Sequence, residues 1–263
     1  MVANILTNIG FVEFIGNMFS KSMYFLFKIK KECAFIFIMS MLSGFPSSAK
    51  YIDDLLSKSL IDKKDAEKAL LFSFFSNPLF IVNTIGIMFF DNMRIGILIL
   101  ICHYLGNVVI GVLFRGFNIN NYSNHIEEFK SKKIDIIRIF LDAIIDSLKT
   151  LALIFGIITV FLIITSIVSA IFHFNFITTS LISSVLEITS GLKLLSQTSL
   201  SIDLKIVLST AVLSFGGLSI HAQIFSILNK YNIRYRYFLL ARILHATISS
   251  IMVLLLLQMG GLF

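Results

Sequence analysis

The sequence has 263 residues, of which 57% are hydrophobic and only 14% charged, and its mean hydropathy is +0.91. This composition excludes an ordinary soluble domain, in which roughly a quarter of the residues are charged. The net charge of +7 does not indicate a nucleic-acid-binding protein, because the cations are spread over short loops such as 28–31 and 234–236. The sequence predicts an all-α polytopic membrane protein bound to the lipid bilayer.

The first half of the chain is predicted to cover residues 1–115. Residues 1–19 favour an interfacial or partly inserted helix, since no basic segment precedes the apolar stretch as it would in a signal peptide. A broken helix over 33–58 is interrupted by the sequence SGFPSS at 43–48. Uncharged residues 95–114 are long enough to form a transmembrane helix.

Between these elements, residues 62–90 predict a kinked helix with Asp62 as its N-cap. Asn77 and Pro78 interrupt it, because proline cannot continue a regular helix. Two readings stay open: a continuous helix that crosses the bilayer through a kink at Pro78, or one arm of a re-entrant hairpin.

A hydrophilic loop over 116–133 separates the first half from a second half over 134–263. Apolar residues at helical spacing predict an amphipathic interfacial helix over 135–149. Residues 150–172 and 237–257 are long enough to cross a hydrocarbon core of about 30 Å. Residues 177–200 predict a re-entrant hairpin with Gly191 at its tip.

A second broken helix is predicted over 204–229, interrupted at 214–219. The two interruptions align without gaps from Gly44 with Gly217 to Lys50 with Gln223. Corresponding interruptions in two halves are typical of secondary transporters, whose substrate binds at the interface of inverted repeats near the bilayer midplane. The sequence therefore predicts two transporter-like repeats with broken or re-entrant helices. Basic residues place loops 115–133 and 230–236 on the cytoplasmic side.

Polar residues near the interruptions are the candidate substrate-binding residues. A helix that begins after Gly217 or at Pro46 directs free N–H groups into its break, which suits a small anion. Charged residues in apolar segments are expected to face the protein interior or a cavity. The substrate-binding candidates are Ser43, Ser47, Lys50, Asn77, Lys193, Gly216, Gly217, Ser219, Gln223 and Arg242. The candidates for proton coupling are Glu187, His221 and His245.

The charged candidates each have a structural alternative. Lys50 could reach the interface beside Asp53 and Asp54, and Arg242 could anchor its helix at the interface. Glu187 could form a structural ion pair with a neighbouring Lys or Arg, namely Lys193 or Arg242.

The polar candidates also have structural alternatives. His221 could pack between helices, and the serines could cap or bridge helices. Interhelical hydrogen bonding would account for the side chains of Asn77, His103 and Asn107. The two cysteines, Cys33 and Cys102, lie in apolar segments without metal-ligand spacing and favour packing. No nucleophile triad, HExxH motif or phosphate loop is present, so the sequence predicts no catalytic residue, metal site, cofactor or enzyme activity.

Six motifs follow one another along nearly the whole chain. They are LSGFPSSAK at 42–50, NPLFI at 77–81, HYLGN at 103–107, EITSGLK at 187–193, SFGGLSIHAQ at 214–223 and ARILHA at 241–246. In this order they resemble the sporulation integral membrane protein family of the YlbJ type, within the group that carries the nucleoside-recognition or Gate domain.

The resemblance implies a membrane protein of endospore-forming bacteria that is made in the mother cell and needed for mature spores. The family's favoured role is to move dipicolinate, a pyridine dicarboxylate, across the outer forespore membrane. A non-transporting scaffold of a sporulation complex is the alternative, and nucleoside transport is the third expectation.

Two features depart from the family pattern. Ser48 replaces the usual glycine of the SGYPxGAK motif. Family members also carry an additional N-terminal membrane segment with an SLLPF-like stretch, the expected first-half counterpart of the hairpin at 187–193. The sequence therefore predicts either a misassigned start site or a shortened form.

Overall fold

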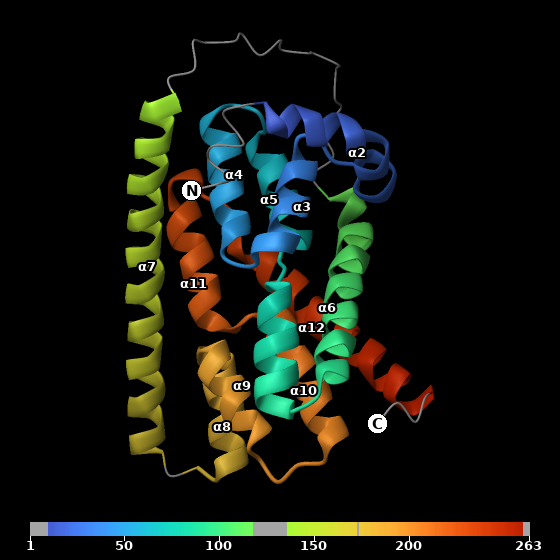
Figure 1. The fold of residues 1–263 in the computed structure, drawn as a ribbon, viewed down its shortest axis with the longest axis vertical. Helices are drawn as coiled ribbons and strands as arrows, with labels where there is room; N and C mark the ends of the chain where they lie inside the picture. Colours follow the sequence, from blue (N-terminus) through green and yellow to red (C-terminus); the bar gives the residue numbers. More distant parts are fainter. Residues whose placement is uncertain (1–9, 118–135, 173, 260–263) are drawn as a thin grey trace.

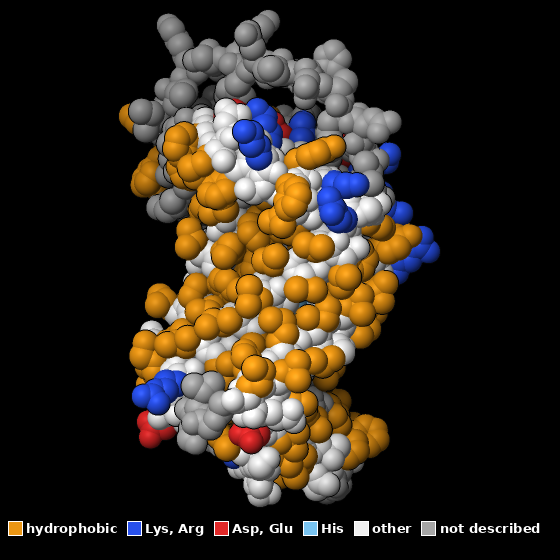
Figure 2. All heavy atoms as spheres, turned by 90° about the vertical axis from the view of Figure 1, so that its right-hand side faces the viewer, with side chains coloured by type: hydrophobic (Ala, Val, Ile, Leu, Met, Phe, Trp, Pro, Cys, Tyr) orange, Lys and Arg blue, Asp and Glu red, His pale blue; other side chains and the backbone are white. Residues whose placement is uncertain are grey.

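The computed structural model describes residues 10–117, 136–172 and 174–259, in which every regular element is a helix. The predicted all-α polytopic class is confirmed. Within the described residues, four helical stretches are long and apolar enough to cross a membrane, namely Met93–Gly116, Phe140–Ile171, Ile202–Tyr231 and Tyr235–Met259. Figure 2 shows hydrophobic side chains over the middle of one face, as expected for a surface in contact with lipid. Residues 1–9 of the expected interfacial helix and residues 118–133 of the expected loop lie outside the described residues.

The first half begins with helix α2 (Phe11–Phe27), which lies across one end of the molecule (Figure 1). Helices α3 (Cys33–Ser43) and α4 (Ser47–Ser57) then form a hairpin that enters the molecule from that end and returns to it. The segment 33–58 is thus a re-entrant hairpin rather than one broken helix. The reason is that Gly44 leaves the helix with a φ of 77°, and the N–H of Phe45 donates to the carbonyl of Phe75 at 2.7 Å.

A broken crossing completes the first half. Helix α5 (Lys63–Phe72) has Asp62 as its N-cap, and the side chain of Asp62 accepts from the N–H of Asp65 at 2.8 Å. The helix ends before residues 73–77, which form no regular structure. The chain then continues in the same direction through the π-helical segment η1 (Phe80–Phe89) and returns in helix α6 (Met93–Leu113) and the short turn η2 (Phe114–Gly116) (Figure 1). The interruption expected at Pro78 is therefore an unwound segment that precedes the proline.

The second half begins with one long helix, α7 (Ile136–Ile171), where the sequence suggested an interfacial helix followed by a membrane helix. No proline or glycine separates the two predicted parts, and the hydroxyl of Thr150 donates to the carbonyl of Asp146 at 2.8 Å, so the helix continues. Helices α8 (Phe176–Leu186) and α9 (Ile188–Ser196) form a second hairpin, which enters from the opposite end (Figure 1).

The tip of the second hairpin is Glu187 and not Gly191. The carboxylate of Glu187 accepts from the N–H groups of Thr189 at 3.1 Å and Ser190 at 2.8 Å, and it thereby starts α9. Gly191 lies inside α9, where an added Cβ would be 2.1 Å from the Cα of Ser184, so its role is close packing of the two hairpin arms.

The second broken crossing consists of α10 (Ile202–Phe215) and α11 (Gly217–Leu228), followed by the turn η3 (Asn229–Tyr231) and helix α12 (Tyr235–Met259). In each half, the hairpin tip touches the break of its own crossing. A Cβ on Gly44 would lie 2.5 Å from the backbone N of Asn77, and a Cβ on Gly217 would lie 3.3 Å from the N of Ile188. The gapless alignment of Gly44 with Gly217 therefore paired a hairpin tip with a break in a crossing, which are different places in the fold.

Basic loops gather at the end where α2 lies, which we call the basic end and define by residues 28–31, 58–64 and 230–236. The ammonium of Lys30 donates to the carbonyl of Leu60 at 2.7 Å, and Arg234 binds Glu67 of α5. The positive-inside rule predicts that this end faces the cytoplasm. The first hairpin consequently enters the membrane from the predicted cytoplasmic side.

Candidate functional site

The two breaks meet in the middle of the molecule. The ring of Phe74 lies against Gly216, where an added Cβ would be 2.2 Å from its Cζ. The ring of Phe45 stacks on Phe74 with centroids 4.8 Å apart. Because Gly217 also lies beside Ile188, both hairpin tips and both breaks form one cluster. We call it the central junction, made of residues 44–46, 73–77, 187–188 and 214–217.

Several helices begin at the central junction (Figure 1). The first turn of α9 is capped by the Glu187 carboxylate, and the side-chain oxygen of Asn77 accepts from the N–H of Leu79 at 2.8 Å. The helices α4 and α11 have no side-chain cap. The free N–H groups of such helix starts carry partial positive charge and bind anions. In α4 the N–H groups of Ser47 and Ala49 already donate to the carbonyls of Gly44 and Pro46, at 3.1 Å and 3.0 Å. The start of α11 is therefore the helix start at the junction that could accept a negatively charged group.

Side chains of α6 bind the backbone of the first break. The Nε2 of His103 accepts from the N–H of Ser76 at 3.0 Å, and Asn107 donates to the carbonyl of Phe74. The hydroxyl of Tyr104 lies 3.0 Å from the carbonyl oxygen of Ser76. Polar backbone groups in a membrane must be paired, and here the protein itself pairs them.

Arg242 of α12 binds next to the same break, at the end of α5. Its guanidinium donates to the carbonyl of Leu71 and to the Nδ1 of His245 at 3.0 Å, and it lies 3.5 Å from the amide oxygen of Asn107. It also lies over the ring of Phe74, 4.5 Å from the centroid. Arg242 is 0% exposed, so the alternative of an interfacial anchor is wrong.

The positive charge of Arg242 has no counter-ion among the described residues. Among the described residues its hydrogen-bond partners are all neutral, and none of the described carboxylates lies within ion-pair distance. Its Nε has no hydrogen-bond partner there either. Burying a charge without a counter-ion is costly, so such a group usually has a functional partner.

Protein groups also form hydrogen bonds with the backbone of the second break. The N–H of Gly216 donates to the carbonyl of Val212 at 2.8 Å, and the Nε2 of His221 donates to the carbonyl of Phe215 at 2.9 Å. The Oγ of Ser214 lies 3.0 Å from the Nδ1 of His103. Protein groups thus bind part of the backbone at both breaks, while the first N–H groups of α11 have no side-chain cap.

The candidates for proton coupling all have fixed partners. Glu187 uses both carboxylate oxygens to cap α9, and it forms no ion pair with Lys193 or Arg242. His221 donates through Nε2 and has the hydroxyl of Tyr235 3.0 Å from its Nδ1. His245 donates through Nε2 to the carbonyl of His103 at 2.8 Å and accepts from Arg242. These contacts give each histidine one donor and one acceptor nitrogen, as in a neutral imidazole.

The structure brings most of the predicted substrate-binding residues to the junction or next to it. Gly216, Gly217, Ser219, Gln223 and Arg242 are buried around the second break. Close to the first hairpin tip lie Ser43, Ser47 and Asn77, where Asn77 donates to the carbonyl of Leu42 at 3.1 Å and the Oγ of Ser43 lies 2.6 Å from the hydroxyl of Tyr51.

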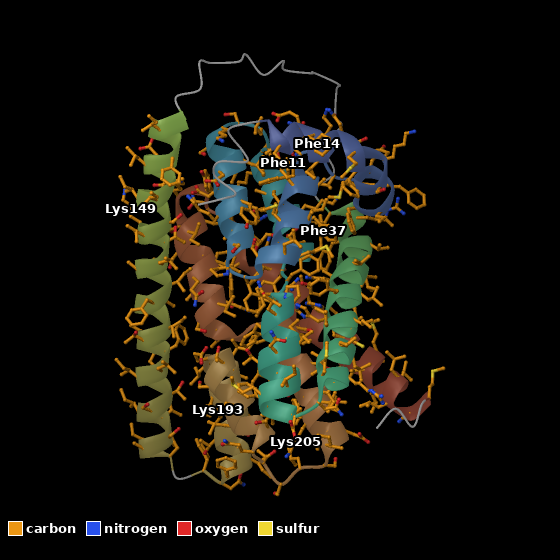
Figure 3. The ribbon with its side chains drawn as sticks, viewed as in Figure 1. Phe11, Phe14, Phe37, Lys149, Lys193 and Lys205 are labelled. Carbon is orange, nitrogen blue, oxygen red and sulfur yellow. The ribbon has the colours of Figure 1, made fainter. Side chains whose placement is uncertain are left out.

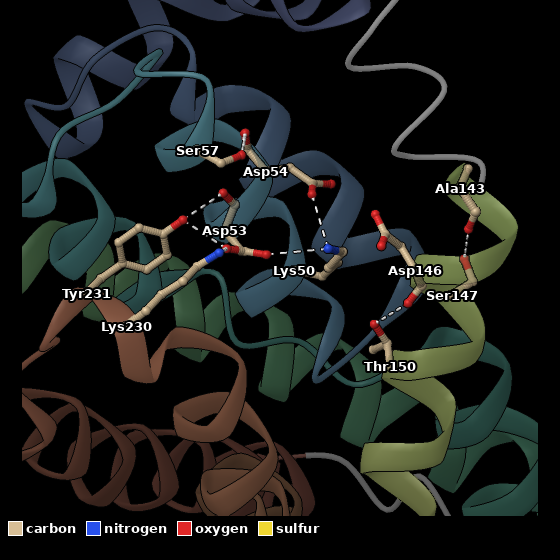
Figure 4. A network of polar contacts seen from close by, with 10 residues as sticks. All are labelled: Lys50, Asp53, Asp54, Ser57, Ala143, Asp146, Ser147, Thr150, Lys230 and Tyr231. Carbon is tan, nitrogen blue, oxygen red and sulfur yellow. Dashed lines mark hydrogen bonds and ion pairs between the residues drawn. The ribbon is translucent and has the colours of Figure 1, made fainter. Parts of the chain in front are cut away.

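Two lysines do not lie at the junction. Lys193 is exposed on α9, and Figure 3 places it toward the end opposite the basic end. Lys50 lies 3.3 Å from carboxylate oxygens of both Asp53 and Asp54, which is the structural alternative considered for it (Figure 4). Both lysines lie in apolar segments of the sequence, but their side chains reach polar surface.

Sequence reasoning missed Ser48 as a site residue. The hydroxyls of Ser48 and Ser219 are buried without a hydrogen-bond partner, and both lie in the first turn of an uncapped helix, α4 and α11. The departure of Ser48 from the family glycine was the available signal. The roles of His103 and Asn107 had a signal as well, since residues four apart share one face of an apolar helix.

The fold and the junction define a polytopic helical membrane protein with two re-entrant hairpins whose tips meet two broken crossings. Over 97% of its length the chain is 28% identical to the sporulation integral membrane protein YlbJ of Bacillus subtilis (strain 168), in an alignment that covers 71% of that protein. This similarity confirms the predicted resemblance to proteins of the YlbJ type. No family model and no solved structure matches the chain.

Proposed function

We propose that this chain acts in sporulation as a membrane transporter that moves dipicolinate or a similar small carboxylate across the outer forespore membrane. The observation that carries the proposal is Arg242, a fully buried guanidinium with neutral partners among the described residues. An anionic solute at the junction would supply the missing negative charge. Arginine is also the side chain best suited to bind a carboxylate.

The junction offers further groups for a dicarboxylate. The uncapped start of α11 presents backbone N–H groups, and the unpaired hydroxyls of Ser48 and Ser219 can each donate one hydrogen bond. In this proposal the two halves are inverted repeats, each composed of a hairpin, a broken crossing and a final long helix. Transporters built in this way bind their substrate where the repeats meet.

The test is uptake of labelled dipicolinate into proteoliposomes. Arg242→Ala is expected to lower uptake at least about tenfold, since a hydrogen bond to a charged group contributes about 1.5–3 kcal/mol. Gln223→Ala is expected to weaken uptake less, and Lys193→Ala on the exposed face of α9 serves as the control. Undiminished uptake in both Arg242→Ala and Gln223→Ala would reject the proposed site.

A non-transporting scaffold of a sporulation complex is the second candidate. It is favoured by one observation, namely that protein groups already bind several backbone groups at both breaks. A verified full-length protein that supports sporulation but shows no dipicolinate uptake would favour the scaffold. Uptake of a labelled nucleoside that dicarboxylates do not inhibit would instead favour nucleoside transport.

A further inference from the structure

Two ion pairs join the first half of the chain to the second at the basic end. The ammonium of Lys230 lies 2.7 Å from the Oδ1 of Asp53, which also accepts from the hydroxyl of Tyr231 at 2.9 Å (Figure 4). The Nε of Arg234 lies 2.9 Å from each carboxylate oxygen of Glu67, and the backbone N–H of Arg234 donates to the same carboxylate at 3.2 Å.

Both carboxylates are largely buried and belong to the first half. Glu67 of α5 is 4% exposed, and 14% of the side chain of Asp53 in α4 is exposed. Both cations come from residues 230–234, which connect α11 to α12. Arg234 is further held by the ring of Tyr237, with its guanidinium carbon 4.6 Å from the centroid. The cations are more exposed, at 60% for the side chain of Lys230 and 38% for that of Arg234, so solvent screens part of the attraction. The bidentate contact and the additional hydrogen bonds make these pairs stronger than single exposed surface pairs.

The Asp53–Lys230 pair lies toward the far ends of two helices that begin at the central junction, and the Glu67–Arg234 pair joins α5 to the residue before α12. Helices α4 and α11 pack against each other, and both run from the junction toward the basic end (Figure 1). Asp53 lies near the end of α4, and Lys230 follows the end of α11 directly. A route from the junction to the basic end between these helices would require their far ends to separate.

We propose that the Asp53–Lys230 and Glu67–Arg234 pairs form a lock that keeps the protein closed at its basic end. When these two ion pairs break, the junction opens toward that end. The use of this lock in transport rests on the proposed function. The lock itself is a property of the conformational equilibrium, so it is testable without any solute.

The test measures the reaction of a cysteine at the junction with a membrane-impermeant maleimide. The reporter is Ser219→Cys, because Ser219 is fully buried in the first turn of α11. The protein is placed in nanodiscs so that the reagent reaches both ends. The native Cys33 and Cys102 are buried, and their slow reaction is subtracted with the chain that lacks the reporter.

Releasing the lock with Asp53→Asn and Glu67→Gln is expected to raise the labelling rate of the reporter about tenfold, the effect of a shift of about 1.4 kcal/mol toward the open form. The matched control is Asp54→Asn. It removes the same charge from the adjacent residue, but the ion pair that it breaks, with Lys50 at 3.3 Å, lies within α4. Its labelling rate should equal that of the unmodified lock.

A charge swap separates release of the lock from general damage. Asp53→Lys combined with Lys230→Asp re-forms the pair in the opposite sense and should return the labelling rate to that of the unmodified lock. No acceleration in the Asp53→Asn, Glu67→Gln chain, or equal acceleration in Asp54→Asn, would overturn the lock. Loss of dipicolinate uptake in the unmodified chain with lock-dependent labelling intact would reject the transport function alone.

Discussion

Replacing Gly216 by alanine tests whether the two breaks are packed as the structure places them. The new methyl carbon would lie 2.2 Å from the Cζ of Phe74 and 2.7 Å from its Cε1. The ring cannot move aside freely, because Phe45 stacks on it and Arg242 lies over it. The backbone of Gly216 also has a φ of 93°, which residues with a Cβ rarely adopt.

The two effects have separable magnitudes. Backbone strain at such a φ costs about 1–3 kcal/mol, and forcing a methyl group into a packed core costs about 1–3 kcal/mol. Gly216→Ala should therefore destabilise the protein by roughly 2–6 kcal/mol. Gly217→Ala is the matched variant: its φ is 68°, but its nearest neighbour would be 3.3 Å away, so strain alone of about 1–3 kcal/mol is expected. Gly156→Ala in α7 meets nothing within 4 Å and should stabilise the helix by about 0.5–1 kcal/mol.

The assay is reversible unfolding in mixed micelles with increasing SDS, followed by circular dichroism. The expected order of stability is Gly156→Ala, then the unmodified chain, then Gly217→Ala, then Gly216→Ala. Equal stabilities of Gly216→Ala and Gly217→Ala would refute the close contact of Gly216 with Phe74, and with it the junction as described.

Three further predictions follow from the same geometry. Arg242→Ala should lower stability in the SDS titration by roughly 2–6 kcal/mol, because the carbonyl of Leu71 and the Nδ1 of His245 each lose a buried donor at about 1–3 kcal/mol; unchanged stability would show that these groups find other donors. The chain contains no tryptophan, so the fluorescence of single-tryptophan variants reports on contact with lipid. Brominated lipid should quench the fluorescence of Phe25→Trp, at a position that is 73% exposed on α2, but not that of Phe27→Trp, at a position that is 1% exposed. Absence of quenching in both variants would place α2 away from the membrane. Lys193→Ala should leave dipicolinate uptake unchanged, and a loss comparable to that of Arg242→Ala would return Lys193 to the site.

The class of fold and the long helices follow directly from composition and segment length. Residues 95–114 and 237–257 fall within the crossing helices Met93–Gly116 and Tyr235–Met259, because an uncharged stretch of that length has few alternatives in a bilayer. The boundary at residue 150 was wrong for a physical reason. Charged residues on one face of a helix mark where it leaves the hydrocarbon, but without a cap, glycine or proline they do not end it.

The two hairpins show the limits of local signals. The rule that a glycine marks a turn selected Gly191, whereas the chain turns at Glu187, whose carboxylate satisfies the first N–H groups of α9. Similarly, Gly44 and Gly217 occupy different topological positions. Gly44 precedes α4 and Gly217 begins α11, and both helices run from the junction to the basic end. This similar local structure is sufficient to produce similar short sequences.

The first break was the hardest feature to predict. Residues 73–77 contain no glycine, and the proline that marks them comes afterwards. Their backbone groups are bound by His103 and Asn107, which are 27 and 33 residues distant in sequence from the groups they bind. Arg242 binds the carbonyl of Leu71 just before them, 171 residues away. A pattern within one segment carries no information on partners so remote. Only their type, polar side chains in apolar helices, was visible beforehand.

The hydrogen bonding and the charge of the junction lead to different conclusions about its ligand. Several backbone groups at both breaks already have protein partners, so a ligand is not needed to pair those groups. The guanidinium of Arg242, in contrast, has no counter-ion among the described residues. A neutral nucleoside would leave this charge uncompensated, whereas a carboxylate would neutralise it in a medium of low dielectric constant, where the interaction is strong. Among the candidate solutes, the buried charge therefore favours a small carboxylate.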